Sequence, residues 1–131
     1  MWTKQVSPET IDNEIELQTI ASKYNICPKI LSVTESSITM EKVNGHTLFE
    51  LYEDDPENVP LWIWDEIRKI VLTLYEEEGI EYIDISPFNF MKLNDKIIVI
   101  DFGDAKYVGD EPDWFLLEFL DGTNMWNPDF K

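Results

Sequence analysis

The strongest hydrophobic pattern in the chain predicts a long helix over residues 61–78. Apolar residues recur there every three or four positions, as on one side of a helix: Ile63, Ile67, Ile70, Val71 and Leu74. Gly79 follows directly, and glycine is common just after the end of a helix. We expect the apolar side to face the core and the three glutamates at positions 76–78 to face solvent.

A second helix is predicted over residues 7–24. Ser7 is a residue type that caps helix starts, and Pro8 suits the first helical position. One face carries apolar residues at helical spacing: Ile11, Ile15 and Ala21. Glu14 lies on the edge of that same face, which makes its carboxylate a candidate functional group.

The other predicted elements are short. Two hairpins are expected from β-prone runs: residues 29–33 with 37–43, and residues 90–93 with 96–100. Two further helices are expected: residues 47–53 and 113–120. The order helix, hairpin, helices, hairpin, helix indicates an α+β fold.

Composition limits the class of protein. With 131 residues, the chain is expected to form a single domain, and 44% hydrophobic residues are enough for a real core. The four tryptophans after position 60 are expected to be mostly buried: Trp62, Trp64, Trp114 and Trp126. The lone Cys27 excludes an internal disulfide, and it fits a reducing, cytoplasmic location.

Charge disfavours two kinds of partner. The chain has 27 acidic and 10 basic residues, a formal net charge of -17, and no cluster of Lys and Arg. Nucleic acids are bound largely through such clusters, so we expect no nucleic-acid partner. Anionic membranes are disfavoured for the same reason.

Two segments carry the candidate chemistry. Asp84 and Asn89 lie in one predicted loop, and Asp101 follows the second strand of the hairpin that comes next. Carboxylate and amide oxygens suit Mg²⁺, which takes one or two protein ligands together with phosphate oxygens and water. Asp84 could accept the proton of an attacking hydroxyl. This arrangement suits phosphoryl transfer from ATP, although each residue alone could be an ordinary turn residue.

The segment from residue 82 to residue 103 resembles the catalytic loop and metal-binding motif of the protein kinase-like superfamily, H-R-D-x-x-x-x-N followed by D-F-G. Tyr82-Ile83-Asp84 stands at H-R-D, Asn89 keeps its offset, and Asp101-Phe102-Gly103 is intact. The resemblance implies that Asp84 is the catalytic base and that Asn89 and Asp101 are the Mg ligands. Asp104 could add a metal ligand or simply repel, and both alternatives stay open.

The resemblance extends toward the N-terminus. Residues 38–48 are similar to the fifth strand and hinge of small kinases, where backbone groups of Glu41 and Val43 would bind adenine. The first helix corresponds to the regulatory helix of the small lobe. It implies Glu14, with Glu16 as runner-up, as the partner of a phosphate-contacting lysine, and Lys4 on a strand just before is the candidate.

The departures from the family pattern predict a truncated two-lobed fold. All five glycines lie at position 45 or later, so no glycine-rich phosphate loop is expected. The small lobe would be reduced to residues 1–44, and residues 45–131 would form a short helical large lobe with no A-P-E motif. These traits are closer to the compact kinase of the KEOPS complex and to sugar or lipopolysaccharide kinases than to regulated protein kinases.

The sequence therefore predicts a minimal atypical kinase that uses ATP and Mg, with a protein Ser/Thr or small-molecule hydroxyl as acceptor. The alternatives are a catalytically inactive pseudokinase acting as a scaffold and, if the motif is accidental, an acidic interaction protein of unrelated fold. A truncated small lobe leaves apolar surface to cover. A homodimer or a partner protein is therefore expected, with the tail from Trp126 to Phe130 as a possible anchor.

Overall fold

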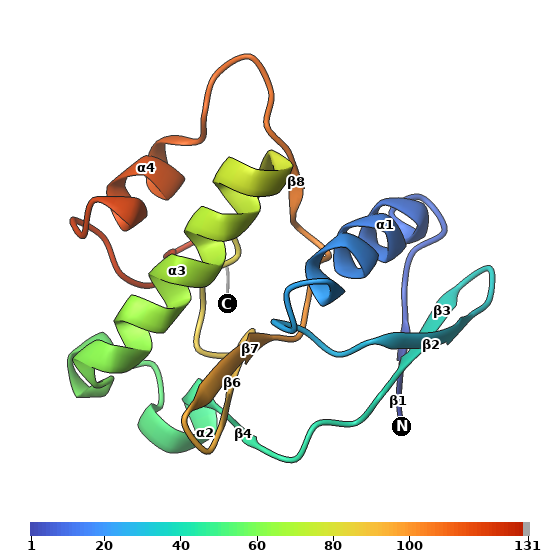
Figure 1. Cartoon of the computed structure of the whole chain (residues 1–131), viewed down its shortest axis with the longest axis horizontal. Helices are drawn as coiled ribbons and strands as arrows, with labels where there is room; N and C mark the ends of the chain where they lie inside the picture. The colour runs from blue at the N-terminus through green and yellow to red at the C-terminus, as the bar shows by residue number, and fades with distance from the viewer. Residues whose placement is uncertain (130–131) are drawn as a thin grey trace.

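The computed structural model describes residues 1–129, and it has the expected α+β composition (Figure 1). Four helices are present in the described part of the chain: α1 (Ile11–Ser22), α2 (Leu48–Tyr52), α3 (Leu61–Glu78) and α4 (Trp114–Leu120). A short 3-10 helix, η1 (Pro56–Asn58), precedes α3. Phe130, part of the expected anchoring tail, lies outside the described residues.

The N-terminal part combines one antiparallel sheet with α1. Its strands are β1 (Trp2–Gln5), β2 (Ile30–Val33) and β3 (Ser37–Met40), in the order β1-β3-β2. A small apolar cluster of Ile11, Ile38 and Met40 joins the helix to the sheet. The register pairs Lys4 with Ile38, so the strand that carries Lys4 is fixed to β3, the central strand of the sheet.

The first helix begins later than the sequence predicted. Residues 8–10 form turns, and α1 starts at Ile11 with Thr10 at its N-cap. Ser7 does not cap the helix: its hydroxyl accepts from the Glu9 N–H at 3.3 Å, and its carbonyl accepts from the N–H of Ile11 at 3.0 Å. Because Ser7 uses these groups in a preceding turn, the predicted start at residue 7 is wrong by about one turn.

The main core surrounds α3, which has the predicted bounds. Gly79 ends this helix in the left-handed conformation, with φ 65°. Figure 1 shows α3 between α4 on one side and α1 on the other. The core cluster also takes Leu17, Ala21 and Cys27 from the N-terminal part, so one set of buried side chains crosses the expected lobe boundary at residue 44. That boundary stays a prediction.

Two smaller sheets complete the fold. One sheet has the strand order β4-β6-β7 and consists of β4 (His46–Thr47), β6 (Phe90–Leu93) and β7 (Lys96–Val99). β6 and β7 are the two strands of the predicted second hairpin. The strands β5 (Ile80–Glu81) and β8 (Lys106–Tyr107) form the other, which the sequence analysis missed. This second pairing connects the end of α3 to the segment after Gly103.

The tryptophans are less uniformly buried than expected. Trp64 is buried, and its ring lies 4.4 Å from that of Trp126, so Trp126 packs onto the chain's own core. Trp62 and Trp114 are 39% and 58% exposed. The expectation of burial is wrong for these two residues, because α3 and α4 turn them away from the core.

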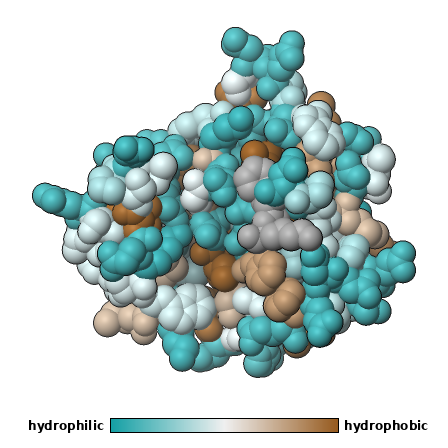
Figure 2. Space-filling view, turned by 180° about the vertical axis from the view of Figure 1, so that it is seen from behind, coloured by the Kyte–Doolittle hydropathy of each residue, from teal (hydrophilic) through white to brown (hydrophobic). Residues whose placement is uncertain are grey.

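The surface is mostly hydrophilic with small apolar areas. Figure 2 shows apolar side chains gathered near the middle of one face, surrounded by hydrophilic ones. Within residues 1–129, no helix is long and apolar enough to cross a membrane.

Candidate functional site

The β6–β7 hairpin brings the two candidate metal ligands together. Asn89 immediately precedes β6, and Asp101 follows β7 after a single intervening residue. Antiparallel pairing matches Phe90 with Val99, and the Ile100 N–H donates to the Asn89 carbonyl at 3.0 Å. The twelve-residue separation in sequence is therefore closed by a hairpin, as the sequence predicted.

Asp84 joins this group through the loop that precedes β6. The side-chain N–H of Asn89 donates to the Asp84 carbonyl at 2.9 Å, and the Asn89 backbone N–H donates to the Ser86 carbonyl at 3.2 Å. These two bonds close the loop from residue 84 to residue 89. Since the amide nitrogen of Asn89 points back into the loop, its amide oxygen is left as an acceptor.

The environment of Asp84 favours its neutral form. Burial raises the pKa of the Asp84 carboxyl to about 6, the hydrogen bond from Asn89 opposes the shift, and the nearby charges of Asp104 and Asp101 add to it. A carboxylate that titrates close to neutral pH suits proton transfer. Carboxyl groups with a strongly shifted pKa are common at functional sites.

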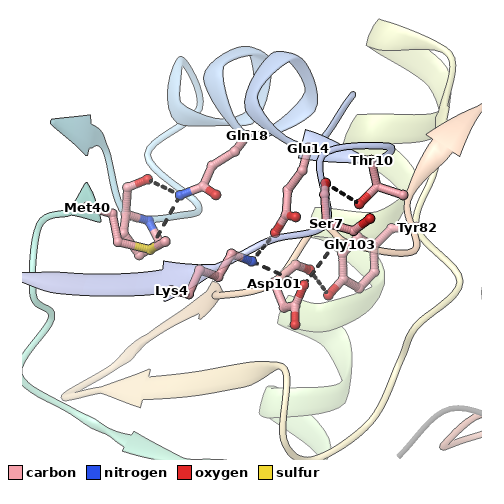
Figure 3. A network of polar contacts seen from close by, with 10 residues as sticks. Lys4, Ser7, Thr10, Glu14, Gln18, Met40, Tyr82, Asp101 and Gly103 are labelled. Carbon is pink, nitrogen blue, oxygen red and sulfur yellow. Dashed lines mark hydrogen bonds and ion pairs between the residues drawn. The ribbon is translucent and has the colours of Figure 1, made fainter. Parts of the chain in front are cut away.

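Lys4 connects the N-terminal sheet to this group (Figure 3). Its ammonium pairs with the carboxylate of Glu14 and lies 3.4 Å from the Asp101 Oδ1. Glu14 is 3% exposed, so its charge has little access to water and depends on the lysine. Glu16, the runner-up, is exposed instead. The structure thus brings together Lys4, Glu14 and Asp101, three residues that the sequence analysis assigned to the site.

Asp101 is further fixed by two backbone contacts. Its Oδ1 accepts from the Gly103 N–H at 2.8 Å, and its carbonyl accepts from the Tyr82 hydroxyl at 2.6 Å. Tyr82 is fully buried, and burial together with nearby carboxylates raises its pKa well above the usual value. Its hydroxyl therefore stays protonated as a donor. The second oxygen of Asp101 takes no part in these contacts.

An open cleft of about 810 Å³ lies between the N-terminal sheet and the β4–β6–β7 sheet. Its apolar lining comes from both sides: Trp2, Val43, Met91 and Ile100. Of the two expected adenine contacts, Val43 lines this cleft and Glu41 does not. The Glu41 N–H donates to the Lys29 carbonyl at 3.0 Å, so only the Glu41 carbonyl remains for a ligand.

Gly45 shapes one wall of the cleft. A Cβ at this position would lie 2.5 Å from the Lys92 carbonyl oxygen, a backbone atom that cannot turn aside. The absence of a side chain lets the segment after Val43 approach β6 closely. The cleft wall therefore depends on this glycine.

The sequence analysis assigned no role to three residues of the site region. Tyr82 was placed in the motif but given no role. Ser86 is fully buried, and its hydroxyl has no hydrogen-bond partner within residues 1–129. Asn13 donates from its side chain to the Ala105 carbonyl at 3.1 Å, which links α1 to the segment after Gly103. Ser86 lies two residues after Asp84 in the segment that resembles the catalytic loop, and this position could have marked it. Nothing local in the sequence marks Asn13.

The donor set fits a magnesium ion held jointly with a nucleotide. Asn89 and Asp101 each keep one hard oxygen free of the contacts described above. Within residues 1–129, no group of three or more His, Cys, Asp or Glu side chains is arranged to hold a metal. Mg²⁺ needs no such cage, because it keeps waters and phosphate oxygens among its ligands.

The hairpin that joins Asn89 to Asp101, with the Lys4–Glu14 pair beside it, defines the class as a protein kinase-like fold. The sequence matches the RIO domain over residues 2–122. This match spans most of the chain, and the chain belongs to the RIO domain family of the atypical protein kinase-like superfamily. The RIO family is a family of atypical kinases and ATPases. An unrelated fold is thereby excluded.

A solved structure agrees with the fold. The chain is similar to Rv3197 from Mycobacterium tuberculosis, solved in complex with erythromycin, with a TM-score of 0.62 and 21% sequence identity. The similarity covers 76% of this chain and 28% of that one, so the chain spans less than a third of its neighbour's length. No curated protein matches the sequence.

Proposed function

We propose that this chain is an atypical kinase that transfers the γ-phosphoryl group of ATP to a hydroxyl acceptor with the help of Mg²⁺. One observation carries the proposal. Asp84, Asn89 and Asp101 meet at one end of the β6–β7 hairpin, and Lys4, paired with Glu14, reaches Asp101 from a separate sheet. A chain without this chemistry has no need to hold all of these groups together.

In the proposed reaction, Asp84 orients the acceptor hydroxyl and takes its proton. The acceptor oxygen forms a bond to the γ-phosphorus, the bond from that phosphorus to the bridging oxygen of ADP breaks, and ADP leaves. Lys4 contacts the phosphates, and Glu14 holds the lysine in place. Asn89 and Asp101 would hold Mg²⁺, which supplies charge neutralisation at the phosphate oxygens.

The cleft suits the adenine end of the nucleotide. Its apolar lining includes Trp2 of β1 and Met91 of β6, so a flat base would meet apolar side chains from both sheets. We propose that the backbone of Val43 and the carbonyl of Glu41 bind the edge of the base. Glu41 is the weaker member of this pair, since its side of the segment lies away from the cleft lining.

The acceptor is proposed as a protein Ser/Thr hydroxyl or a small-molecule hydroxyl. The raised pKa of Asp84 supports proton transfer, which a pseudokinase acting only as a scaffold does not need. We further propose a cytoplasmic location, where ATP is abundant and the buried Cys27 thiol stays reduced.

A partner at the N-terminal sheet is also proposed. β1 pairs only with β3 within residues 1–129, so its other edge presents backbone N–H and C=O groups. Exposed edges of this kind pair readily with another strand. A second copy or another protein could add such a strand beside Lys4 and cover the phosphates. The oligomeric state by light scattering, with and without MgATP, tests the homodimer.

The test of the proposed function is Mg²⁺-dependent ATP binding by calorimetry and thermal shift. Ligand at about 100 times its dissociation constant should stabilise the protein by roughly 2.7 kcal/mol. Asp101→Asn should abolish the Mg²⁺ dependence, and Asp84→Asn should keep binding but lose turnover. No binding at millimolar ATP contradicts the enzyme proposal for this chain alone. The scaffold is favoured if the native chain binds ATP without turnover and if Asp84→Asn leaves its affinity for a partner protein unchanged.

A further inference from the structure

Phe88 is exposed in a stretch that is otherwise shielded. From position 80 to position 93, Phe88 is the only exposed residue, with 39% of its surface accessible to solvent. It stands between Ser86, which is fully buried, and Asn89, which is 8% exposed. Because Asn89 closes the loop by hydrogen bonds to residues 84 and 86, this exposure is built into an ordered loop.

The exposed ring has a partner on α2. Phe49 stacks on Phe88 with ring centroids 4.4 Å apart and an angle of 25° between the planes. Phe49 is itself 37% exposed. The Phe49 N–H donates to the Pro87 carbonyl at 2.9 Å, so the helix start is fastened to the loop of Asp84. We call Phe49 and Phe88 together the aromatic shelf.

The shelf joins two segments that belong to the two parts of the proposed site. On one side Thr47, Glu50 and Leu51, which flank Phe49 in sequence, line the nucleotide cleft. On the other side Phe88 is four residues from Asp84, in the same closed loop. The Thr47–Glu50 capping box fixes the start of α2 on the cleft side.

The shelf is poorly explained by folding alone. Exposed phenylalanine rings lose much of the free energy that burial would provide. The two rings gain contact with each other, yet each keeps more than a third of its surface in water. Neither ring lines the cleft itself, but Thr47, Glu50 and Leu51 of the same segment do, and grouped exposed apolar side chains in such a segment are typical of ligand sites.

We propose that the aromatic shelf binds the planar or apolar face of a small, uncharged or cationic hydroxyl compound and presents its hydroxyl to Asp84. This inference rests on the proposed function and specifies its acceptor. The net charge of -17 disfavours anionic acceptors. Stacking on an aromatic side chain favours a ring or other flat group.

A small molecule fits the shelf better than an extended peptide. Extended peptides are commonly held by backbone pairing with a strand edge. The shelf is built from a five-residue helix and a loop closed on itself, and neither offers such an edge. The recognition surface that remains is two ring faces and their rims.

The test compares two probes that carry the same sugar hydroxyls, phenyl β-glucoside and methyl β-glucoside. Their binding to the full chain is measured with MgADP present, by NMR of protein with labelled phenylalanine rings. We expect the phenyl probe to shift the Phe49 and Phe88 signals and to bind more tightly. Phe88→Ala should reduce its affinity by about twofold to tenfold, the value of one stacking contact, and leave the methyl probe unchanged.

Two further variants control for folding and surface effects. Phe88→Leu keeps an apolar side chain without a ring, so it should fold normally and still lose the preference for the phenyl probe. Trp114→Ala removes an exposed aromatic residue from α4, away from α2, and should leave both affinities unchanged (Figure 1). Thermal unfolding of each variant shows whether it is folded.

The outcomes separate this inference from the proposed function. Loss of the phenyl preference in both Phe88 variants, with unchanged MgATP affinity, supports the shelf as an acceptor site. Normal MgATP binding with no preference for the phenyl probe, or with the preference intact in the variants, overturns the shelf alone. Exclusive binding and phosphorylation of Ser/Thr peptides also overturns it. Absence of MgATP binding contradicts the proposed function instead.

Discussion

The Tyr82 hydroxyl donates a hydrogen bond to the Asp101 carbonyl at 2.6 Å, across 19 positions of sequence. Tyr82 begins the loop of Asp84, so one bond connects the proposed base segment to the proposed metal ligand. The ring is held edge-on by Phe90 and Phe102, with centroids 5.8 and 5.6 Å away. The position of Asp101 is therefore set by a buried aromatic cluster as well as by the hairpin.

Tyr82→Phe should keep this packing and remove only the hydroxyl. We expect a loss of about 1–2 kcal/mol in the free energy of unfolding, because the Asp101 carbonyl loses a buried partner. MgATP affinity should fall as Asp101 becomes less well placed. Chemical denaturation and calorimetry measure the two effects. Tyr107→Phe, which removes an exposed hydroxyl beside Glu16, is the matched control and should change neither.

Lys4→Met should destabilise the fold as well as weaken ATP binding. The buried carboxylate of Glu14 would lose its partner, at a cost of about 1–3 kcal/mol, reduced by the partial exposure of Lys4. Glu14→Gln should weaken MgATP binding with a smaller loss of stability, since no charge is left buried. Glu16→Gln is the control. Equal effects of the two glutamine variants on ATP affinity would contradict the assigned pair.

The sequence predicted those parts of the site that depend on local pattern. Asn89 and Asp101 flank a hairpin whose strands and turn are visible in the sequence, so their meeting could be foreseen. Lys4 and Glu14 were paired only through the resemblance to kinases, since ten positions and a turn separate them. The roles of all these residues stay predictions.

The contacts that the sequence could not predict involve very short strands or residues far apart in the sequence. β5 and β8 have two residues each, too few for any periodic pattern, and their two residue pairs are 25 and 27 positions apart. Asn13 meets Ala105 across 92 positions, and its identity carries no signal of that bond. Ser7 looked like a helix cap because residue type does not show that a turn would use its hydroxyl first. Such outcomes depend on tertiary packing.

Gly45→Ala should damage the nucleotide cleft more than a usual surface change. The new Cβ would meet the Lys92 carbonyl oxygen at 2.5 Å, so β4 must shift away from β6. We expect a loss of about 1–3 kcal/mol in unfolding free energy, the range for overpacking, and weaker MgATP binding. Gly109→Ala is the control, since a Cβ there meets nothing within 4 Å. Identical behaviour of the two variants would show that the close approach is unimportant.

The raised pKa of Asp84 predicts opposite pH dependences for stability and activity. The folded state holds the proton of Asp84 up to about pH 6, whereas the ordinary value is 3.8. Between these values the native state binds more protons, so Asp84 makes the fold less stable as the pH rises through about 6. One pKa unit is worth about 1.4 kcal/mol, which sets an upper bound of about 3 kcal/mol, and solvent screening of this half-buried carboxyl makes the effect smaller. Asp84→Asn should remove this dependence and unfold at a higher temperature at pH 7.

Activity should rise over the same pH range in which this contribution to stability falls. The reason is that only the ionised carboxylate of Asp84 can take the proton of the attacking hydroxyl. The pH profile of kcat/KM should therefore show an acid limb near pH 6. Asp104→Asn should move that limb to lower pH, since Asp104 helps to raise the pKa of Asp84. ATP itself titrates equally in both proteins, so the difference between the profiles isolates Asp84. Superimposable limbs would mean that a group other than Asp84 controls the reaction.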